Sequence, residues 1–305
     1  MISFVVLHYL NEEVTSKCIS LLLNQRTYLK YNVVVVDNFS NNNSLQVLKE
    51  KWQDKKNVHF ISCKKNFGFA EGNNAGYIYS KENLYADTII IMNNDIFIYD
   101  SSFIDKIRNL QCLNDFEIIA PDIISKDGIH QNPFRLESFS NIRLIQYALK
   151  KILLRIIYKI PIINKIKLEH SYFKNKNKKM EKAINERNVI TMVVPHGSCI
   201  VFTNKWITKE SSAFCPYTFL YGEEDILYEY IVNKKYKSIF IPSIKVTHLE
   251  DVSTDTLIKT DLKKINFFMR HSLKSCFILL RIRLYNLIKK PIIYKERDLD
   301  YYILK

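Results

Sequence analysis

Short runs of apolar, mostly β-branched residues alternate with longer mixed segments up to residue 125. Runs that are apolar throughout belong to strands buried on both faces, as in a parallel sheet covered by helices. Ligands of such sheets bind at the carboxyl ends of the strands. The alternation therefore predicts an α/β fold with a mostly parallel central sheet and helices on both faces. The predicted strands are Ile2–Leu7, Val33–Val36, Val58–Ile61, Thr88–Met92 and Ile118–Ala120, and the predicted helices are Glu12–Asn24, Ser44–Trp52, Glu71–Ser80 and Ser102–Leu110.

The alternation breaks between residues 135 and 188. Apolar residues from Ile145 to Ile160 recur there at helical spacing, with Lys and Arg around them. A similar apolar stripe, from Ile265 to Leu287, recurs near the C-terminus with basic residues on its flank. We expect a basic helical insertion and a basic, helical C-terminal appendage.

The α/β pattern resumes after the insertion. Its predicted elements are the apolar stretch Thr191–Phe202, a helix at Glu223–Asn233, and strands at Ser238–Ile241 and Lys245–His248. The chain thus divides into one half of an α/β domain (1–130), the insertion (131–190), the other half of the domain (191–258) and the C-terminal region (259–305).

Positive charge is concentrated in two segments. The formal net charge is +14, yet residues 143–182 hold twelve Lys and Arg against two acids, and residues 259–290 hold nine against one. Amphipathic helices rich in Lys and Arg bind anionic membrane surfaces. We expect such a surface to be a partner; alternatively, both apolar stripes pack onto the domain and the charges are solvated.

The remaining composition bears on the compartment. Six cysteines are scattered with no CxxC pair, which argues against a zinc site and a disulfide framework and indicates a reducing compartment. We find no signal peptide before the strand at Ile2–Leu7, and no apolar run of the ~18–20 residues that span a bilayer. We expect a cytoplasmic protein, peripheral at the inner face of the plasma membrane.

Two polar clusters follow the second and third predicted strands. Asp37 and Asn38 close the second strand, where a carboxylate can bind a base or ribose; helix capping before Ser44 is the structural alternative. The segment Asn66–Gly76 holds three of the six glycines and follows the third strand. Glycine allows close approach of a ligand and a helix N-terminus favours anions, although a structural turn explains the segment equally well.

Two further clusters carry carboxylates. Asn93-Asn94-Asp95 ends the fourth strand, where Asp95 suits a divalent cation, although Asp and Asn also simply terminate strands. The residues 222–225, Gly-Glu-Glu-Asp, begin a predicted helix. One of these carboxylates would suit a general base; alternatively, the acids only complement the helix dipole. His248 ends a predicted strand, and both a ligand role and a purely structural role fit a histidine at that position.

The order of these clusters resembles the family 2 glycosyltransferases, especially bacterial polysaccharide and rhamnosyltransferase-like members. The resemblance lies in Val-Val-Val-Val-Asp-Asn-x-Ser, Asn-x-Gly-Phe-Ala-x-Gly-Asn-Asn, Asn-Asn-Asp, Gly-Glu-Glu-Asp-Ile and Val-x-His. An early Ser-Leu-Leu-Leu-Asn-Gln helix at 20–25 is also similar. The resemblance covers residues 2–125 and 190–250 and implies a GT-A-type, Rossmann-like fold.

The resemblance also implies roles. Asp225 would be the base of an inverting transfer, with Glu224 orienting it or contacting the acceptor. Asp95 and His248 would bind Mg²⁺ or Mn²⁺. The donor would be an NDP-sugar and the acceptor a saccharide, lipid-linked if the membrane expectation holds, in surface polysaccharide synthesis. The nucleotide-sugar pocket would comprise Asp37, Asn38, Asn66, Gly68, Asn74, Asn93 and Asn94.

Two departures from the family pattern affect these roles. Asn93 stands at the first acidic position of the DxD-type motif, which removes one carboxylate from the metal site. Leu227 stands where relatives often carry a second acid, which leaves the assignment among Glu223, Glu224 and Asp225 open.

Three other functions compete with that of a glycosyltransferase. A nucleotidyltransferase needs a basic, Gly-rich segment after the first strand, but His8–Glu13 is acidic and lacks glycine. A nucleic-acid binder would use the basic segments, but we find no such motif and expect no nucleic acid partner. A catalytically degenerate scaffold stays open because of Asn93.

Overall fold

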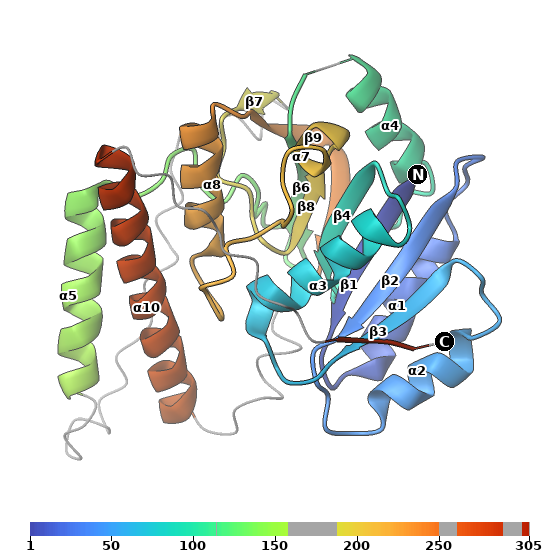
Figure 1. The fold of residues 1–305 in the computed structure, drawn as a ribbon, viewed down its shortest axis with the longest axis horizontal. Helices are drawn as coiled ribbons and strands as arrows, with labels where there is room; N and C mark the ends of the chain where they lie inside the picture. Colours follow the sequence, from blue (N-terminus) through green and yellow to red (C-terminus); the bar gives the residue numbers. More distant parts are fainter. Residues whose placement is uncertain (114, 158–187, 250–260, 289–300, 305) are drawn as a thin grey trace.

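A single mixed sheet forms the centre of the molecule (Figure 1). The structure is a computed structural model that describes residues 1–113, 115–157, 188–249, 261–288 and 301–304. Within these residues ten strands pair in the order β10-β3-β2-β1-β4-β8-β6-β9-β5, and β7 pairs with β9. The strands are β1 (Ile2–His8), β2 (Tyr31–Asp37), β3 (Val58–Cys63), β4 (Thr88–Asn93), β5 (Ile96–Phe97), β6 (Ile118–Ser125), β7 (Ile190–Thr191), β8 (Cys199–Phe202), β9 (Ser238–His248) and β10 (Tyr301–Leu304).

The sheet is mostly parallel, as the sequence predicts. Strands β3, β2, β1 and β4 pair in parallel, and β6 is parallel to β9. Strand β8 separates the two groups and is antiparallel to both β4 and β6. The carboxyl ends of β2, β1 and β4 therefore lie on one edge, with Asp37 beside His8 and Leu7 beside Asn93 in the register.

Successive residues of the central strands point to opposite faces, and helices cover both. On β1, Phe4 and Val6 pack into one hydrophobic cluster and Val5 into another. This two-sided burial explains the continuous apolar runs. The first cluster includes residues of α1 (Glu12–Leu23), α2 (Ser44–Trp52) and α4 (Phe103–Leu113), and the second includes residues of α3 (Gly68–Glu82), α7 (Asn204–Ile207) and α8 (Glu223–Lys234).

Helix α3 packs on the sheet through glycines. The sequence predicts its start at Glu71, but the helix begins at Gly68 and includes the glycine segment. A Cβ on Gly76 would lie 2.3 Å from Val5 Cγ1, and one on Gly72 would lie 2.9 Å from Leu7 Cδ1. These two glycines are explained by the close contact of helix and sheet.

The expected strands Ser238–Ile241 and Lys245–His248 form one strand, β9. Its pairing with β6 shifts register between Pro121 and Asp122, which accommodates the residues between the two expected strands. The continuous strand carries His248 to the same end of the sheet as the close of β6.

Two long helices lie side by side at one end of the molecule (Figure 1). They are α5 (Asn141–Ile157) and α10 (Asp261–Leu287), and Leu144 of α5 shares a hydrophobic cluster with Cys276 and Leu279 of α10. Residues 141–157 of the expected insertion are thus helical, whereas residues 131–140 are not, and residues 158–187, including Ile160, lie outside the described residues. In the C-terminal region, expected to be helical, β10 instead pairs antiparallel with β3.

None of the helices in the described parts of the chain is both long and apolar enough to cross a membrane.

Candidate active site

Asp95 and His248 meet where β4 ends. Asp95 lies between β4 and β5, and Ile96 of β5 pairs with His248 at the end of β9. This register brings the two side chains together, with Asp95 Oδ1 3.5 Å from His248 Nε2. Both residues are buried. The pairing expected from the sequence is thus present in the geometry.

The Asp95 Oδ1 atom is a buried acceptor. Among the described residues it has no hydrogen-bond partner, and a buried polar atom without one is costly. A cation beside it would satisfy this oxygen, and carboxylate and imidazole are both metal ligands. In the described part of the chain no group of three or more His, Cys, Asp or Glu gathers to hold a metal. The residues present therefore fit a cation held by two protein ligands.

The loop before β8 connects this pair to Glu224. The ring of His196 lies 5.9 Å from that of His248, at an interplanar angle of 69°. The next residue, Gly197, donates its backbone N–H to the Glu224 carboxylate. A Cβ on Gly197 would lie 2.9 Å from Glu224 Oε1, so glycine leaves room for this carboxylate. Asp95, His248 and Glu224 thus share one continuous set of contacts.

Glu223 and Glu224, the first two residues of α8, both have carboxyl groups with a raised pKa. Burial raises the pKa of both carboxyl groups, and repulsion between nearby carboxylates adds to the effect. Glu223 is fully enclosed, and its Oε1 has no hydrogen-bond partner among the described residues. Glu224 is only half-buried. A carboxylate with a raised pKa is suited to receive a proton.

Asp225, one residue further, belongs to a different set of contacts. Its Oδ2 accepts from Arg135 Nη2 and its Oδ1 accepts from Ser138 Oγ at 3.1 Å. Arg283 of α10 donates to the same Ser138 hydroxyl at 3.0 Å and pairs with Glu229 of α8 at 2.7 Å. Both oxygens of Asp225 therefore have protein partners, in a network that joins α8 to α10.

Asp37 and Asn38 lie at the same sheet edge, at the end of β2. The Asp37 carboxylate accepts from the Ser40 N–H and the Ser62 hydroxyl, each at 3.1 Å. Burial raises its pKa, and these hydrogen bonds oppose the rise. Asn38 donates to Gly68 O at 2.9 Å, which fixes the start of α3 against β2.

The other predicted pocket residues hold neighbouring segments in place. Their hydrogen bonds go to the protein itself, so contact with a nucleotide stays a prediction for them. Asn66 Oδ1 accepts from the Gly68 N–H, Gly68 packs on Phe219 O, Asn74 bonds the backbone of Phe214, the Asn93 N–H donates to Ser198 O, and Asn94 Nδ2 donates to Thr15 Oγ1.

Sequence reasoning missed several residues around this site. His196 and Gly197 precede β8, where a His-Gly pair beside a strand could have been noticed. Arg135 and Gln131 come from the expected insertion, where no periodic pattern marks them. The structure shows that this segment supplies partners to both Asp225 and His248.

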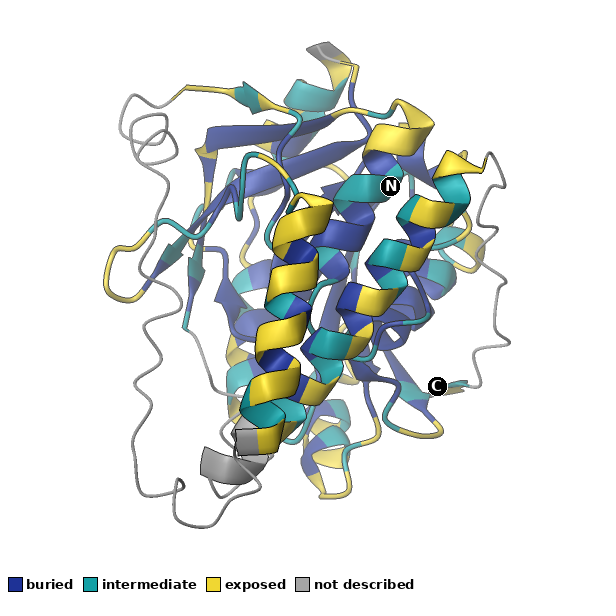
Figure 2. Cartoon of the chain, turned by 90° about the vertical axis from the view of Figure 1, so that its left-hand side faces the viewer, coloured by how far each residue is buried: buried dark blue, intermediate teal, exposed yellow. Residues whose placement is uncertain are grey.

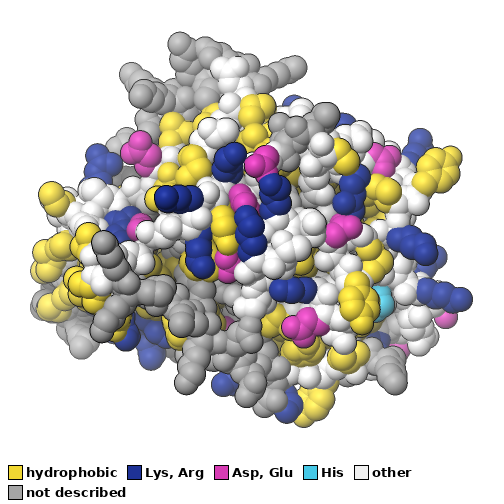
Figure 3. All heavy atoms as spheres, turned by 45° about the horizontal axis from the view of Figure 1, so that its top comes forward, with side chains coloured by type: hydrophobic (Ala, Val, Ile, Leu, Met, Phe, Trp, Pro, Cys, Tyr) yellow, Lys and Arg dark blue, Asp and Glu magenta, His cyan; other side chains and the backbone are white. Residues whose placement is uncertain are grey.

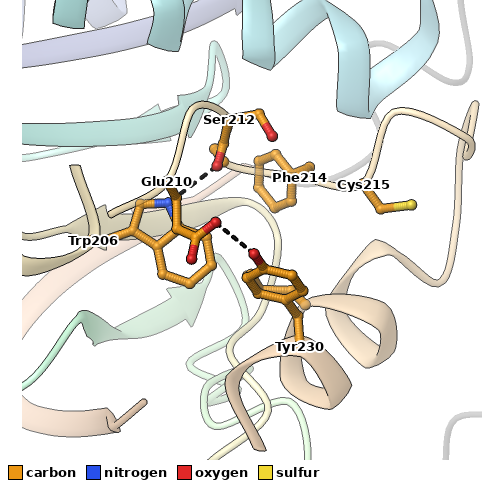
Figure 4. A pocket seen from close by; sticks show the side chains of 8 residues that line it. Trp206, Glu210, Ser212, Phe214, Cys215 and Tyr230 are labelled. Carbon is orange, nitrogen blue, oxygen red and sulfur yellow. Dashed lines mark hydrogen bonds between the residues drawn. The ribbon is translucent and has the colours of Figure 1, made fainter. Parts of the chain in front are cut away.

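A separate polar cluster surrounds Trp206 (Figure 4). Trp206 Nε1 donates to Ser212 O at 3.1 Å, and the hydroxyls of Tyr230 and Tyr236 donate to the Glu210 carboxylate. These polar groups satisfy one another, in contrast with Asp95. The cluster is explained by its role in holding α7 against α8.

Comparison with known proteins identifies a family for the chain. The model of "Glycosyl transferase family 2" matches residues 3–168. The low-salt glycan biosynthesis hexosyltransferase Agl10 of Haloferax volcanii is 27% identical over 131 residues, which cover 43% of this chain and 39% of Agl10. The aligned part is thus well under two thirds of that relative.

Two solved structures of S. aureus TarS 1–349 resemble the fold. One has a TM-score of 0.51 at 13% identity and covers 94% of this chain and 74% of that one. The other, in complex with UDP-GlcNAc, has a TM-score of 0.50 at 13% identity and covers 88% and 65%. The expected GT-A-type architecture is confirmed by this likeness in fold. Because the family match extends over more than half of its length, the chain belongs to glycosyltransferase family 2.

Proposed function

We propose that the protein transfers a sugar from a nucleoside-diphosphate sugar to a saccharide hydroxyl, with inversion at the anomeric carbon. The observation that carries the proposal is the contact series that joins Asp95 and His248 to Glu224. One end suits a cation beside a diphosphate, and the other end suits a base beside an acceptor.

The donor would bind along the shared edge of β2, β1 and β4. Asp37, at the end of β2, would accept a hydrogen bond from the base or ribose. The TarS structure with UDP-GlcNAc supports a UDP-sugar as the first donor class to examine.

Asp95 and His248 would hold Mg²⁺ or Mn²⁺, which when bound neutralises charge on the donor diphosphate. Asp95 contributes its unpartnered Oδ1, and His248 contributes Nε2. Asn93, at the end of β4, provides no charge to this group.

Glu224 would receive the proton of the acceptor hydroxyl. The hydroxyl oxygen bonds to the anomeric carbon as the bond from that carbon to the diphosphate oxygen breaks, and the nucleoside diphosphate leaves. The sequence alone favours Asp225 as the base. The geometry favours Glu224, because both Asp225 oxygens accept hydrogen bonds from Arg135 and Ser138. We assign Asp225 the role of holding the start of α8.

A thermal-shift screen of the purified protein with Mn²⁺ and UDP-, GDP- and dTDP-sugars tests the donor class. A ligand at 100 times its dissociation constant stabilises the fold by about 2.7 kcal/mol, a shift that is readily measured. We expect one nucleotide series to raise Tm and Asp95→Asn to reduce that rise. No shift with any nucleotide sugar, in a protein that melts cooperatively, contradicts the proposal.

Helix α5 supports a lipid-linked acceptor at an anionic membrane. Its outward face is exposed (Figure 2) and includes Leu149 at 60% and Leu153 at 57% exposure, with Arg143 and Lys150 also at the surface. Hydrophobic side chains gather at the left of Figure 3, the side of α5, whereas basic and acidic side chains are mixed over the rest of that face. Apolar and basic residues together suit a membrane interface.

The stripe of α10 contributes less. Met269 and Cys276 of this stripe are buried, so the alternative that the stripe packs onto the protein describes much of α10.

Because the exposed apolar residues are on α5, binding to anionic vesicles should be lost in a Leu149→Asp, Leu153→Asp double variant. Val232→Asp, an exposed apolar site on α8, is the matched control. Absence of vesicle binding by the wild-type protein at low salt contradicts membrane contact, and with it the peripheral location at the inner face of the plasma membrane.

A further inference from the structure

The orientation of His248 depends on a side chain from the segment between β6 and α5. His248 Nδ1 lies 2.7 Å from Gln131 Oε1. An amide oxygen only accepts hydrogen bonds, so Nδ1 carries the proton and donates. The neutral ring then has its lone pair on Nε2, the nitrogen that lies 3.5 Å from Asp95 Oδ1. Two electron-pair donors thus face each other, an arrangement that a cation stabilises.

Gln131 is itself fixed by the sheet. Its backbone N–H donates to Ile123 O at 2.8 Å, and His130 forms a β-bridge with Ile124 of β6. At the close of β6, Ser125 pairs with His248 in the register of β9. The segment therefore folds back along β6 and places Gln131 beside the last residue of β9.

The neighbouring histidine has the opposite tautomer. The Ser198 backbone N–H donates to His196 Nδ1 at 3.2 Å, so this nitrogen accepts and Nε2 carries the proton. Of these two adjacent rings, only His248 offers a lone pair at Nε2.

We propose that Gln131 is a positioning residue that holds His248 in the Nδ1–H tautomer, so that Nε2 and Asp95 together bind the divalent cation. The inference rests on the metal site of the proposed function. Partners of this kind on the far nitrogen of a ligating histidine fix the ring and its tautomer, and their loss lowers metal affinity by about 10–100-fold.

Two variants separate the hydrogen bond from the fold. Gln131→Leu removes the acceptor, whereas Gln131→Glu keeps an oxygen at the same reach. Mn²⁺ affinity, measured by electron paramagnetic resonance with UDP present, should fall by about 10–100-fold in Gln131→Leu and stay within a few fold of wild type in Gln131→Glu. Circular dichroism and Tm would establish that both variants fold.

A second readout needs no metal. Imidazole ¹⁵N resonances of the wild-type protein should show His248 protonated at Nδ1 and His196 protonated at Nε2, and Gln131→Leu should lose the fixed Nδ1–H pattern of His248 alone. Wild-type His248 protonated at Nε2, or Gln131→Leu with wild-type Mn²⁺ affinity, overturns the inference. If Asp95→Asn and His248→Ala also bind Mn²⁺ as tightly as wild type, the metal site itself is wrong; if they lose binding while Gln131→Leu does not, only the role of Gln131 is wrong.

Discussion

Glu224 and Asp225 are adjacent in sequence but belong to regions with opposite character. Glu224 is half-buried, accepts from Gly197 and connects through His196 to His248 and Asp95. Asp225 has a protein partner on each oxygen, in a network that extends to α10. The contrast indicates that a carboxylate with a side-chain partner on each oxygen holds the structure, whereas one that retains acceptor capacity is available for chemistry.

The largest effect should follow Glu224→Gln. Loss of a general base costs about 10²–10⁴-fold in turnover, whereas the fold should be retained because the amide oxygen still accepts from Gly197. Steady-state kinetics with a verified donor and acceptor would measure the loss. Turnover within a few fold of wild type would remove Glu224 from the role of base.

Asp225→Asn should reduce stability more than it reduces turnover. The variant loses the charge that pairs with Arg135, and we expect unfolding to become easier by about 1–3 kcal/mol. Chemical denaturation would give this value, and a double-mutant cycle with Arg135→Met would isolate the pair. A turnover loss as large as that of Glu224→Gln, at unchanged stability, would return the base to Asp225.

Gly76→Ala tests the packing of the scaffold that positions the donor side. The added Cβ would lie 2.3 Å from Val5 Cγ1 and 2.7 Å from Val36 Cγ2. Overpacking of this kind costs about 1–3 kcal/mol. Gly128→Ala is the control for added volume, because a Cβ there meets nothing within 4 Å. Any loss of stability in that variant reports the positive φ of 76° at Gly128 and not overpacking. A Tm for Gly76→Ala equal to that of wild type would show that α3 can shift outward freely.

Glu223→Gln should change the pH dependence of stability, the smallest effect. Burial raises the pKa of Glu223 in the folded state above its ordinary value of 4.5. The folded protein therefore holds its proton more tightly than the unfolded chain, and stability is lost as pH rises from that value toward the raised pKa. Urea midpoints across this range should decline less in Glu223→Gln than in wild type. Parallel profiles would mean that Glu223 ionises freely in the fold.

The sheet and most helices could be predicted because they rest on local patterns. The apolar runs of β1, β2 and β4 are buried on both faces, which is the pattern of a parallel sheet covered by helices. The extent of α3 was predicted less well, since glycines that serve helix–sheet contact resemble those of a ligand loop. No sequence pattern predicted the pairing of β10 with β3. A strand as short as β10 forms because of its tertiary contact with β3, which the local sequence does not encode.

The site was predictable in part for the same reason. Asp95 follows one strand and His248 ends another, and strand ends converge. The proposed division of labour between Glu224 and Asp225 was not predictable, because it depends on Arg135 and Ser138, which a nonperiodic segment brings to α8. The partner of His248, Gln131, comes from that same segment.

Mn²⁺ binding in the presence of UDP, compared among wild type, Asp95→Asn and Glu224→Gln, tests the central claim that cation and base occupy opposite ends of one site. The account predicts that Asp95→Asn loses Mn²⁺ affinity by tenfold or more, that Glu224→Gln binds Mn²⁺ as wild type does, and that both variants lose turnover. Wild-type Mn²⁺ affinity in Asp95→Asn, or full turnover in either variant, would contradict it.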